Sequence, residues 1–324
     1  MLMKIDLYAR CWNEADMLPF FFLHYDKLVH RYIIYDDAST DDSQEILRLN
    51  PKVELRPMPY SDPDSRIRSA LALQEACWRE SRGIADWVII TDIDEHLYHP
   101  DMYHYLAQCR AQGVTIIPAL GYQMLSEHFP EHNTLLCQSL TRGACDIVYS
   151  KLSIFSPNEI DAVNYTPGRH CAAPTGRVVL PARDELLLLH YHYLGFERVR
   201  KRKAQFVTRH RKTDIAMGWE STWSSKQLRE AWNLIASRLV DISQPDLRPW
   251  ETHGGPRWWR PPYLNYGETD ETPRWWRILV PSIRRRRSIP IVLHSLISWL
   301  KRVLKRCLPD RLLKLLRKFT APAP

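Results

Sequence analysis

The segment Asp86-Trp-Val-Ile-Ile-Thr-Asp-Ile-Asp-Glu95 decides the fold, because a short apolar run of strand character ends in acids at Asp92, Asp94 and Glu95. Side chains alternate along an extended chain, so Asp92 and Asp94 are expected to share one face. Two neighbouring carboxylates repel each other unless a cation lies between them, and Mg²⁺ or Mn²⁺ is the usual one. The segment suggests a metal site that binds substrate phosphates, although a plain polar turn is the alternative for so short a pattern.

The first half of the chain alternates strands with helices. The residue pattern predicts strands at 4–10, 31–35, 53–56 and 87–91, and helices at 18–28, 39–49 and 64–82. Such an alternation predicts parallel crossovers and a doubly wound α/β sheet. Ligands of these sheets bind beyond the carboxyl ends of the strands, and the acids expected there are Asp36, Asp37, Asp92 and Asp94.

Five stretches carry a resemblance to a known family. They are Arg10-Cys-Trp-Asn-Glu14, Tyr35-Asp-Asp-Ala-Ser-Thr-Asp-Asp-Ser43, Asp92-Ile-Asp-Glu95, Pro167-Gly-Arg-His170 and Leu188-Leu-His-Tyr-His-Tyr-Leu-Gly-Phe-Glu197. Together they resemble the family 2 glycosyltransferases, and the last two are similar to the branch whose members read roughly "LLHYHYLSFE". The resemblance covers about residues 3–212.

This resemblance implies both a fold and an activity. The fold is of the GT-A type, a doubly wound, mixed and mostly parallel sheet flanked by helices. The activity is metal-dependent transfer of a sugar from a nucleotide-diphosphate sugar to a glycan or lipid-linked acceptor, as in surface polysaccharide biosynthesis. The cation, Mn²⁺ or Mg²⁺, would neutralise the charge that builds up on the departing diphosphate.

The resemblance also implies roles for individual residues. The first acidic loop would contact the base or ribose, and Asp92 and Asp94 would hold the cation, with a further ligand from His190 and with His192 and His170 behind it. The implied nucleotide-sugar-binding residues are Arg10, Asn13, Glu14, Asp36, Asp37, Arg66, Asp92 and His170. Two plain alternatives stay open: a partly buried histidine bonded to the backbone at His190, and a solvated first helical turn at Arg66.

Inverting transfer needs a carboxylate that takes the proton from the acceptor hydroxyl. In this fold it commonly lies between the metal motif and the downstream histidine, and the acids of that window are Glu127, Glu131, Asp146 and Glu159. Glu127 and Asp146 are the two candidates, with Glu127 slightly preferred because it falls in an expected acceptor loop. The window holds no Glu-Asp pair, which departs from the commoner family pattern.

The chain is expected to have three parts. Residues 1–212 form the nucleotide-sugar-binding and catalytic domain, and residues 213–283 form a helical, Trp- and Pro-rich extension that packs on this domain or on the acceptor side. Residues 284–324 form a basic amphipathic helical tail. From Arg277 onward there are 13 Lys or Arg and one acid, a net charge of +12, so the rest of the chain carries −4.

The tail pattern favours an anionic membrane surface, where each basic residue contributes about 1 kcal/mol. A helix docked on the body or on a partner is the alternative, and nucleic-acid binding is not expected because stacking aromatics and a known module are missing. The seven scattered cysteines lack a Cys-x-x-Cys pair, which favours reduced thiols. With neither a secretory signal nor a membrane span apparent, the expected location is cytoplasmic, peripherally associated with the inner face of the membrane.

Two other functions fit the same residues. A nucleotidyltransferase or phosphoesterase would use the same carboxylates around Mg²⁺. A catalytically inactive scaffold would keep the acidic cleft and use the tail for recruitment to a membrane. Release of a nucleoside diphosphate, of pyrophosphate, or of neither would separate the three.

Overall fold

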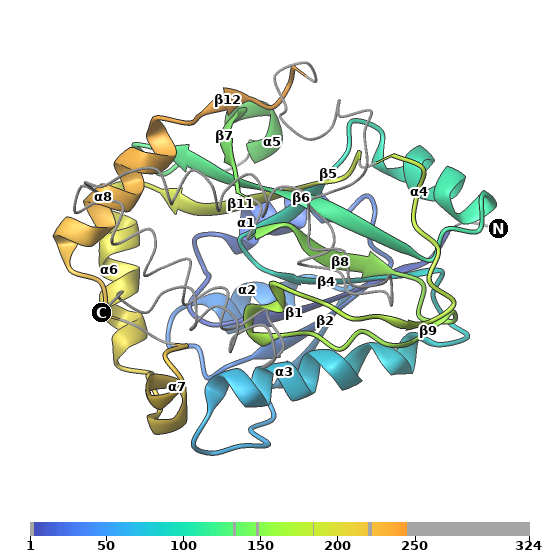
Figure 1. Cartoon of the computed structure of the whole chain (residues 1–324). Helices are drawn as coiled ribbons and strands as arrows, with labels where there is room; N and C mark the ends of the chain where they lie inside the picture. The colour runs from blue at the N-terminus through green and yellow to red at the C-terminus, as the bar shows by residue number, and fades with distance from the viewer. Residues whose placement is uncertain (1–2, 132–133, 147–148, 184, 220–221, 245–324) are drawn as a thin grey trace, which may run out of the picture.

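A computed structural model describes residues 3–131, 134–146, 149–183, 185–219 and 222–244. Its centre is one ten-stranded mixed sheet with the order β12-β7-β6-β8-β4-β1-β2-β3, and β11 pairs with both β5 and β6 (Figure 1). A separate two-stranded ribbon joins β9 (Ile160–Ala162) and β10 (Thr175–Gly176). Helices lie on both sides of the large sheet (Figure 1).

The first half of the sheet is parallel. It consists of β1 (Ile5–Cys11), β2 (Arg31–Asp36), β3 (Val53–Pro57) and β4 (Trp87–Asp92), all predicted from the apolar pattern. The connecting helices are α1 (Leu18–Tyr25), α2 (Ser43–Leu49) and α3 (Arg66–Ala76). The expected doubly wound, mixed sheet flanked by helices is confirmed, and its longest strand pairings are the parallel ones.

The second half of the sheet combines both strand directions. Its strands are β5 (Glu95–Tyr98), β6 (Ile116–Ser126), β7 (Arg142–Cys145), β8 (Lys151–Phe155), β11 (Leu187–Leu194) and β12 (Val240–Asp241). β11 runs parallel to β6 and antiparallel to β5. Because β5 follows β4 after a two-residue turn, this pairing brings the acids at the end of β4 beside β11.

Alternate residues of the central strands pack into two different cores. In β4, Trp87 and Ile89 join the core under α1, α2 and α4 (Met102–Ala111), whereas Val88 and Ile90 join the core under α3. A strand that is covered on both faces has to be apolar on both, which explains the continuous Trp-Val-Ile-Ile run. The polar residues are thereby confined to the strand ends, where the candidate site lies.

Three local expectations are corrected. The helix expected from Ser39 begins at Ser43, because the preceding residues form a loop whose hydroxyls and carboxylates bond to backbone N–H groups. The helix expected at 64–82 is capped by Ser65 and changes to the 3₁₀ segment η1 (Cys77–Ser81). Most important for the site, β4 ends at Asp92 and the chain turns at once, so the alternation expected to align Asp92 with Asp94 does not apply.

Beyond residue 212 the structure describes α7 (Lys212–Ala216), α8 (Ser225–Ala236) and the edge strand β12. α8 packs through Leu228 and Trp232 against Tyr193 at the end of β11 and Val199 of α6 (Phe196–Val207). The Trp-rich stretch at 250–276 and the basic tail at 284–324 lie outside the described residues. In the part that is described, none of the helices has the length and apolar character needed to cross a bilayer.

Candidate metal centre

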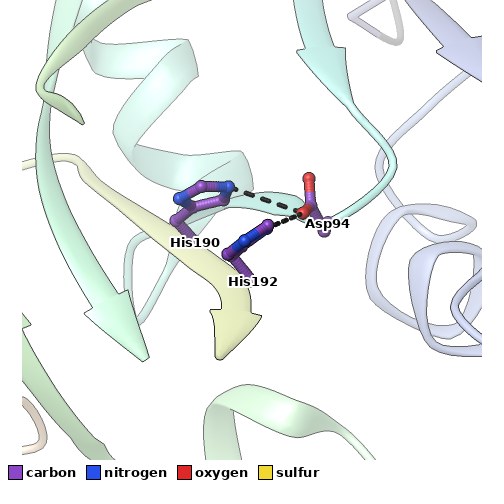
Figure 2. Close-up of side chains that lie close together, drawn as sticks. All are labelled: Asp94, His190 and His192. Atoms are coloured by element: carbon purple, nitrogen blue, oxygen red, sulfur yellow. Dashed lines mark ion pairs between the residues drawn. The ribbon is translucent and has the colours of Figure 1, made fainter. Parts of the chain in front are cut away.

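Two histidines and one aspartate converge beside the carboxyl end of β4 (Figure 2). His190 and His192 are two residues apart on β11 and point to the same side, and Asp94 faces them from the turn between β4 and β5 (Figure 2). His190 Nε2 lies 3.5 Å and His192 Nδ1 lies 3.6 Å from the same oxygen, Asp94 Oδ2. We call Asp94, His190 and His192 the His–Asp trio.

Neighbouring groups hold the His–Asp trio in place. The backbone N–H of Tyr191 donates to the carbonyl oxygen of Asp94 at 2.8 Å, which fastens the turn to β11. Gln123 Oε1 on β6 lies 2.9 Å from His190 Nδ1, and the ring of Tyr149 stacks on that imidazole with centroids 5.0 Å apart. Ligand side chains that are fixed from behind in this way are typical of metal sites.

The charge states of Asp94 and His192 suit a cation. Burial raises the pKa of Asp94, but the interactions with His190 and His192 dominate and hold it well below its usual range, so the carboxylate is charged at neutral pH. Burial lowers the pKa of His192 to about 3, helped by the charge of Lys203 on α6. A neutral imidazole and a charged carboxylate are the forms that bind metal ions.

The spacing of the trio also fits a metal ion. One ligand atom from each residue lies within 4.8 Å of the others, and among the described residues this is the one such group of three or more histidine, cysteine or acidic side chains. With metal–ligand bonds of about 2.1 Å, two ligand atoms in a tetrahedral site lie about 3.4 Å apart. The observed nitrogen–oxygen separations of 3.5 and 3.6 Å are close to that value.

Asp92 does not belong to this group. Its Oδ1 pairs with Arg10 Nη2 at 3.0 Å, and its Oδ2 lies 3.4 Å from Arg169 Nη2. Burial raises the pKa of Asp92, but Arg10 and Arg169 more than offset this and lower it. In this structure two guanidinium groups face Asp92 and the two histidines face Asp94, and the expected role of Asp92 as a metal ligand stays a prediction.

A buried ion cluster adjoins Asp92 through Arg169. Glu95 accepts from Arg169 Nη2 at 2.5 Å and also pairs with Lys151 on β8. The side chains of Glu95, Arg169 and Lys151 are 2%, 1% and 4% exposed. Burial raises the pKa of Glu95, but Lys151 and Arg169 prevail and lower it, so Glu95 is ionised at neutral pH. We call Glu95, Lys151 and Arg169 the buried ion cluster.

Both carboxylates of the first acidic loop, Asp36 and Asp37, already have hydrogen-bond or ion-pair partners within the protein. Asp36 Oδ2 accepts from the N–H of Ser39 at 3.1 Å and from Gln44 Nε2 at 2.8 Å. Asp37 pairs with Arg209 at 2.7 Å and accepts a hydrogen bond from the hydroxyl of Tyr60. Both acids are almost fully buried at the end of β2, next to β1.

Helix α6 fastens the turn after β1 through arginines. Arg198 Nη2 donates to Asp16 Oδ1 at 3.0 Å, and Arg202 pairs with Glu14. Arg209, just beyond α6, holds Asp37. We call Arg198, Arg202 and Arg209 the arginine clasp. Asn13 adds to the rigidity of this turn, because its side-chain oxygen accepts from the N–H of Thr40 at 2.7 Å and its φ is 50°.

The nucleotide-site candidates Arg10, Arg66 and His170 line a common cavity. Its volume is about 180 Å³, and Trp219 and Gln74 also border it. Arg66 starts α3, with its guanidinium 5.8 Å from the ring centroid of Phe206. The ring centroids of His170 and Tyr149 are 5.3 Å apart, and Tyr149 also stacks on His190. The ring of Tyr149 thus connects the wall of the cavity with the His–Asp trio.

The two base candidates lie in different surroundings. Glu127 is exposed, and its Oε1 accepts from Trp232 Nε1 at 3.0 Å. Asp146 is half-buried and adds to the effect of burial in raising the pKa of Tyr149 and Tyr193. Tyr149 stacks on His190 and its N–H donates to the carbonyl oxygen of Asp146 at 3.0 Å, which brings Asp146 near the trio. The roles of Glu127 and Asp146 stay predictions.

Several residues of the site escaped sequence reasoning. Arg169 lies inside the recognised Pro167–His170 stretch, yet His170 was chosen there. Glu95 lies in the recognised Asp92–Glu95 stretch, and Lys151 was noted at the start of a strand near the site, but no pattern indicated that the two are buried as a pair. His192 was placed behind His190, although a His-x-His spacing on a strand puts both rings on one face. The arginines of α6 were not among the candidate site residues.

The sequence matches no known family profile, and no curated protein matches it in sequence. Among solved structures it is similar to glucosyl-3-phosphoglycerate synthase from Mycobacterium tuberculosis in complex with Mn²⁺, UDP and glucosyl-3-phosphoglycerate, with 20% identity, 37% of this chain and 44% of that chain covered, and a TM-score of 0.26. It is also similar to residues 1–349 of S. aureus TarS in complex with UDP, with 12% identity, 48% and 47% covered, and a TM-score of 0.28. The chain thus spans less than half the length of these structures, and its function has to be inferred from its own residues.

Proposed function

We propose that this chain is a metal-dependent glycosyltransferase that moves a sugar from a nucleotide-diphosphate sugar to a glycan or lipid-linked acceptor, in surface polysaccharide assembly. The observation that carries the proposal is the His–Asp trio at the carboxyl edge of the sheet, close to a cavity bordered by Arg10 and Arg66. Acids and histidines that hold a cation beside guanidinium groups are suited to a diphosphate.

The residues divide the work by their positions. Asp94, His190 and His192 would hold Mn²⁺ or Mg²⁺, which supplies Lewis-acid stabilisation of the departing diphosphate. Arg10 and Arg66 border the cavity and would bind phosphate oxygens by charge-assisted hydrogen bonds.

The nucleoside would bind at the loop after β2. Asp36 and Asp37 lie next to the turn that carries Asn13 and Glu14. The N–H of Asn13 donates to Ser39 Oγ and the N–H of Thr40 donates to Asn13 Oδ1, and these two hydrogen bonds hold the loop and the turn together. A carboxylate accepts hydrogen bonds from ribose hydroxyls and from base N–H groups. Asp37 already forms an ion pair with Arg209. A contact with the nucleoside therefore requires Asp37 to bind both groups at once or to release Arg209.

Transfer breaks the bond between the anomeric carbon and the β-phosphate oxygen, and forms one to the acceptor oxygen. The electron pair of the broken bond stays with the nucleoside diphosphate, and the acceptor proton passes to a carboxylate. We assign this base to Asp146, which lies near Tyr149 beside the trio, and retain Glu127 as the second candidate. The tail at 284–324 would hold the enzyme at the inner face of an anionic cytoplasmic membrane, near a lipid-linked acceptor.

The test is a panel of nucleotide sugars incubated with the chain and Mn²⁺, in which release of the nucleoside diphosphate is measured. Asp94→Asn is expected to lower the rate by at least about 100-fold, because the charge on the cation site is lost. Asp161→Asn, an exposed acid, is the matched control and should keep the wild-type rate. Release of pyrophosphate or phosphate instead would identify the nucleotidyltransferase or phosphoesterase alternative. If no product forms and no nucleotide sugar raises Tm, the catalytically inactive scaffold is the function that remains.

A further inference from the structure

A second cavity lies between α6 and the loops that follow β1 and β2. Its volume is about 460 Å³, within the range of about 300–1,000 Å³ that is usual for small-molecule sites. We call it the α6 cavity. Its border includes one glutamine and five charged residues: Gln205, Asp16, Asp41, Arg198, Lys201 and Arg202. The donor contacts proposed above use none of these six side chains.

The charges around the α6 cavity largely cancel. Both of its arginines belong to the arginine clasp, where each is already held by a carboxylate. The other two charges on the border are those of Lys201 and Asp41, which have opposite signs. A ligand of this cavity therefore gains little from a net charge of its own.

The cavity bordered by Arg10 and Arg66 has a different electrostatic character. Among the described residues its border includes these two arginines and no acid. Such a positive border suits the diphosphate of the donor, because opposite charges attract it and orient it. The comparison of the two cavities assigns the charged substrate to the first and favours an uncharged one in the α6 cavity.

The α6 cavity presents both donors and acceptors of hydrogen bonds. Lys201 and Gln205 are exposed on α6, and within the described part of the chain the ends of both side chains have no bonding partner. Asp41 accepts from the backbone N–H groups of Ala15 and Ser43 at 3.1 and 3.0 Å, which leaves lone pairs on both of its oxygens. A sugar hydroxyl donates and accepts at once, so an ammonium, an amide and a carboxylate together suit a saccharide.

The α6 cavity is close to the candidate metal centre. α6 follows β11, the strand that carries the two histidines, after Gly195 alone. Burial lowers the pKa of Arg198, but its bond to Asp16 outweighs burial, and the charge of Asp94 raises the pKa further. Asp94 can act on Arg198 in this way only from nearby. A ligand in the α6 cavity would thus lie beside the His–Asp trio.

We infer that the α6 cavity is the acceptor site and that its ligand is the uncharged saccharide end of the acceptor. Asp41, Lys201 and Gln205 would bind its hydroxyl groups. The inference rests on the proposed function, because it names the second substrate of the same reaction. The nucleoside is the alternative occupant, but Asp36 and Asp37 do not border this cavity, and none of the described residues on its border has an aromatic ring on which a base could stack.

Saturation-transfer difference NMR on the full chain tests the binding without a donor. The probes are the neutral disaccharides lactose, maltose and cellobiose, each measured alone and with UDP or GDP. At least one is expected to receive saturation and to keep it when the nucleoside diphosphate is added. Gln205→Trp fills the cavity and should abolish this signal, whereas Gln108→Trp is the matched control, because it replaces an exposed glutamine on α4, at the other end of the molecule from α6 (Figure 1).

Three results of this experiment would overturn the inference. They are the absence of binding by every disaccharide, displacement of the disaccharide by a nucleoside diphosphate, and a signal that Gln205→Trp leaves unchanged. Displacement would identify the cavity as the nucleoside site instead.

Kinetics with the disaccharide that binds separate the acceptor from the donor. Lys201→Ala and Gln205→Ala should each raise the KM of the disaccharide by about 2- to 10-fold, the equivalent of one hydrogen bond, and change the KM of the nucleotide sugar much less. Equal increases in both KM values would contradict the assignment. If a saccharide binds and no nucleotide sugar is consumed, the proposed function fails and the saccharide site stands. If nucleotide sugar is consumed and no saccharide binds, the cavity assignment fails and the proposed function stands.

Discussion

Replacement of Lys151 by methionine removes one of the two cations that face Glu95 in the buried ion cluster. Methionine has nearly the length of the lysine stem, so packing is largely preserved and the change is mainly one of charge. Glu95 is then left with Arg169, whose Nη2 also lies 3.4 Å from Asp92. A carboxylate that is 2% exposed cannot exchange the lost partner for water.

Removing one partner of a buried ion pair costs about 3–5 kcal/mol when the other charge stays uncompensated. Arg169 compensates Glu95 in part, so we expect a loss at the lower end, about 3 kcal/mol. For a protein of this size each 1 kcal/mol lowers Tm by about 2–4 °C, which predicts a fall of about 6–12 °C. The double variant Lys151→Met with Glu95→Gln removes one charge of each sign and should recover more than half of the loss.

Urea unfolding followed by tryptophan fluorescence and by circular dichroism measures these changes. Arg177→Met is the control, because its ion pair with Glu159 has side chains 51% and 38% exposed and should leave the unfolding midpoint unchanged. A loss below about 1 kcal/mol for Lys151→Met, or a double variant no more stable than the single one, would refute the reasoning.

The same cluster sets a dependence on pH. The pKa of Glu95 is lowered on folding, so the folded protein binds fewer protons here than the unfolded chain does. The stabilisation is therefore complete above the unfolded pKa of about 4.3, and it is lost as the pH falls through the folded value. Wild-type stability should fall more steeply below this pH than that of the double variant, and parallel curves would contradict the assignment.

Three further predictions concern other parts of the chain. Gly121→Ala places a Cβ 2.3 Å from the carbonyl carbon of Tyr149, so we expect displaced Tyr149, weaker Mn²⁺ binding and a lower Tm; calorimetry with unchanged affinity would contradict this. Asp214→Asn should cost about 1–2 kcal/mol in urea unfolding, because this buried carboxylate caps the first turn of α3 by accepting from the N–H of Arg66 at 2.9 Å. Deletion of 284–324 should abolish sedimentation with anionic vesicles and leave the activity of the body intact; unchanged sedimentation would exclude the membrane tail.

The sheet could be predicted because its signal is local. Four apolar runs with helices between them fix the parallel half, and packing on both faces leaves acids only at the strand ends. Helix ends were less accurate, since loop side chains such as those of Ser39 and Asp41 accept from backbone N–H groups and delay the start of a helix.

The site was predictable only in part, because its pairings are long-range. Arg169 reaches Asp92 from 77 residues away in the sequence, and no local pattern specifies that contact. The strand rule that aligned Asp92 with Asp94 failed at the turn after β4, where the chain reverses into β5. His190 is near Asp94 as expected, and its role as a ligand stays a prediction, as do the roles of the nucleotide and base candidates.

The continuity of β11 with α6 has a mechanical consequence. Gly195, with φ of 71°, is the joint between the strand that carries His190 and the helix that carries Arg198 and Arg202. The two imidazoles and the arginines of α6 therefore lie on consecutive elements that meet at Gly195. The backbone conformation at Gly195 thus sets the position of the α6 arginines relative to the candidate metal ligands.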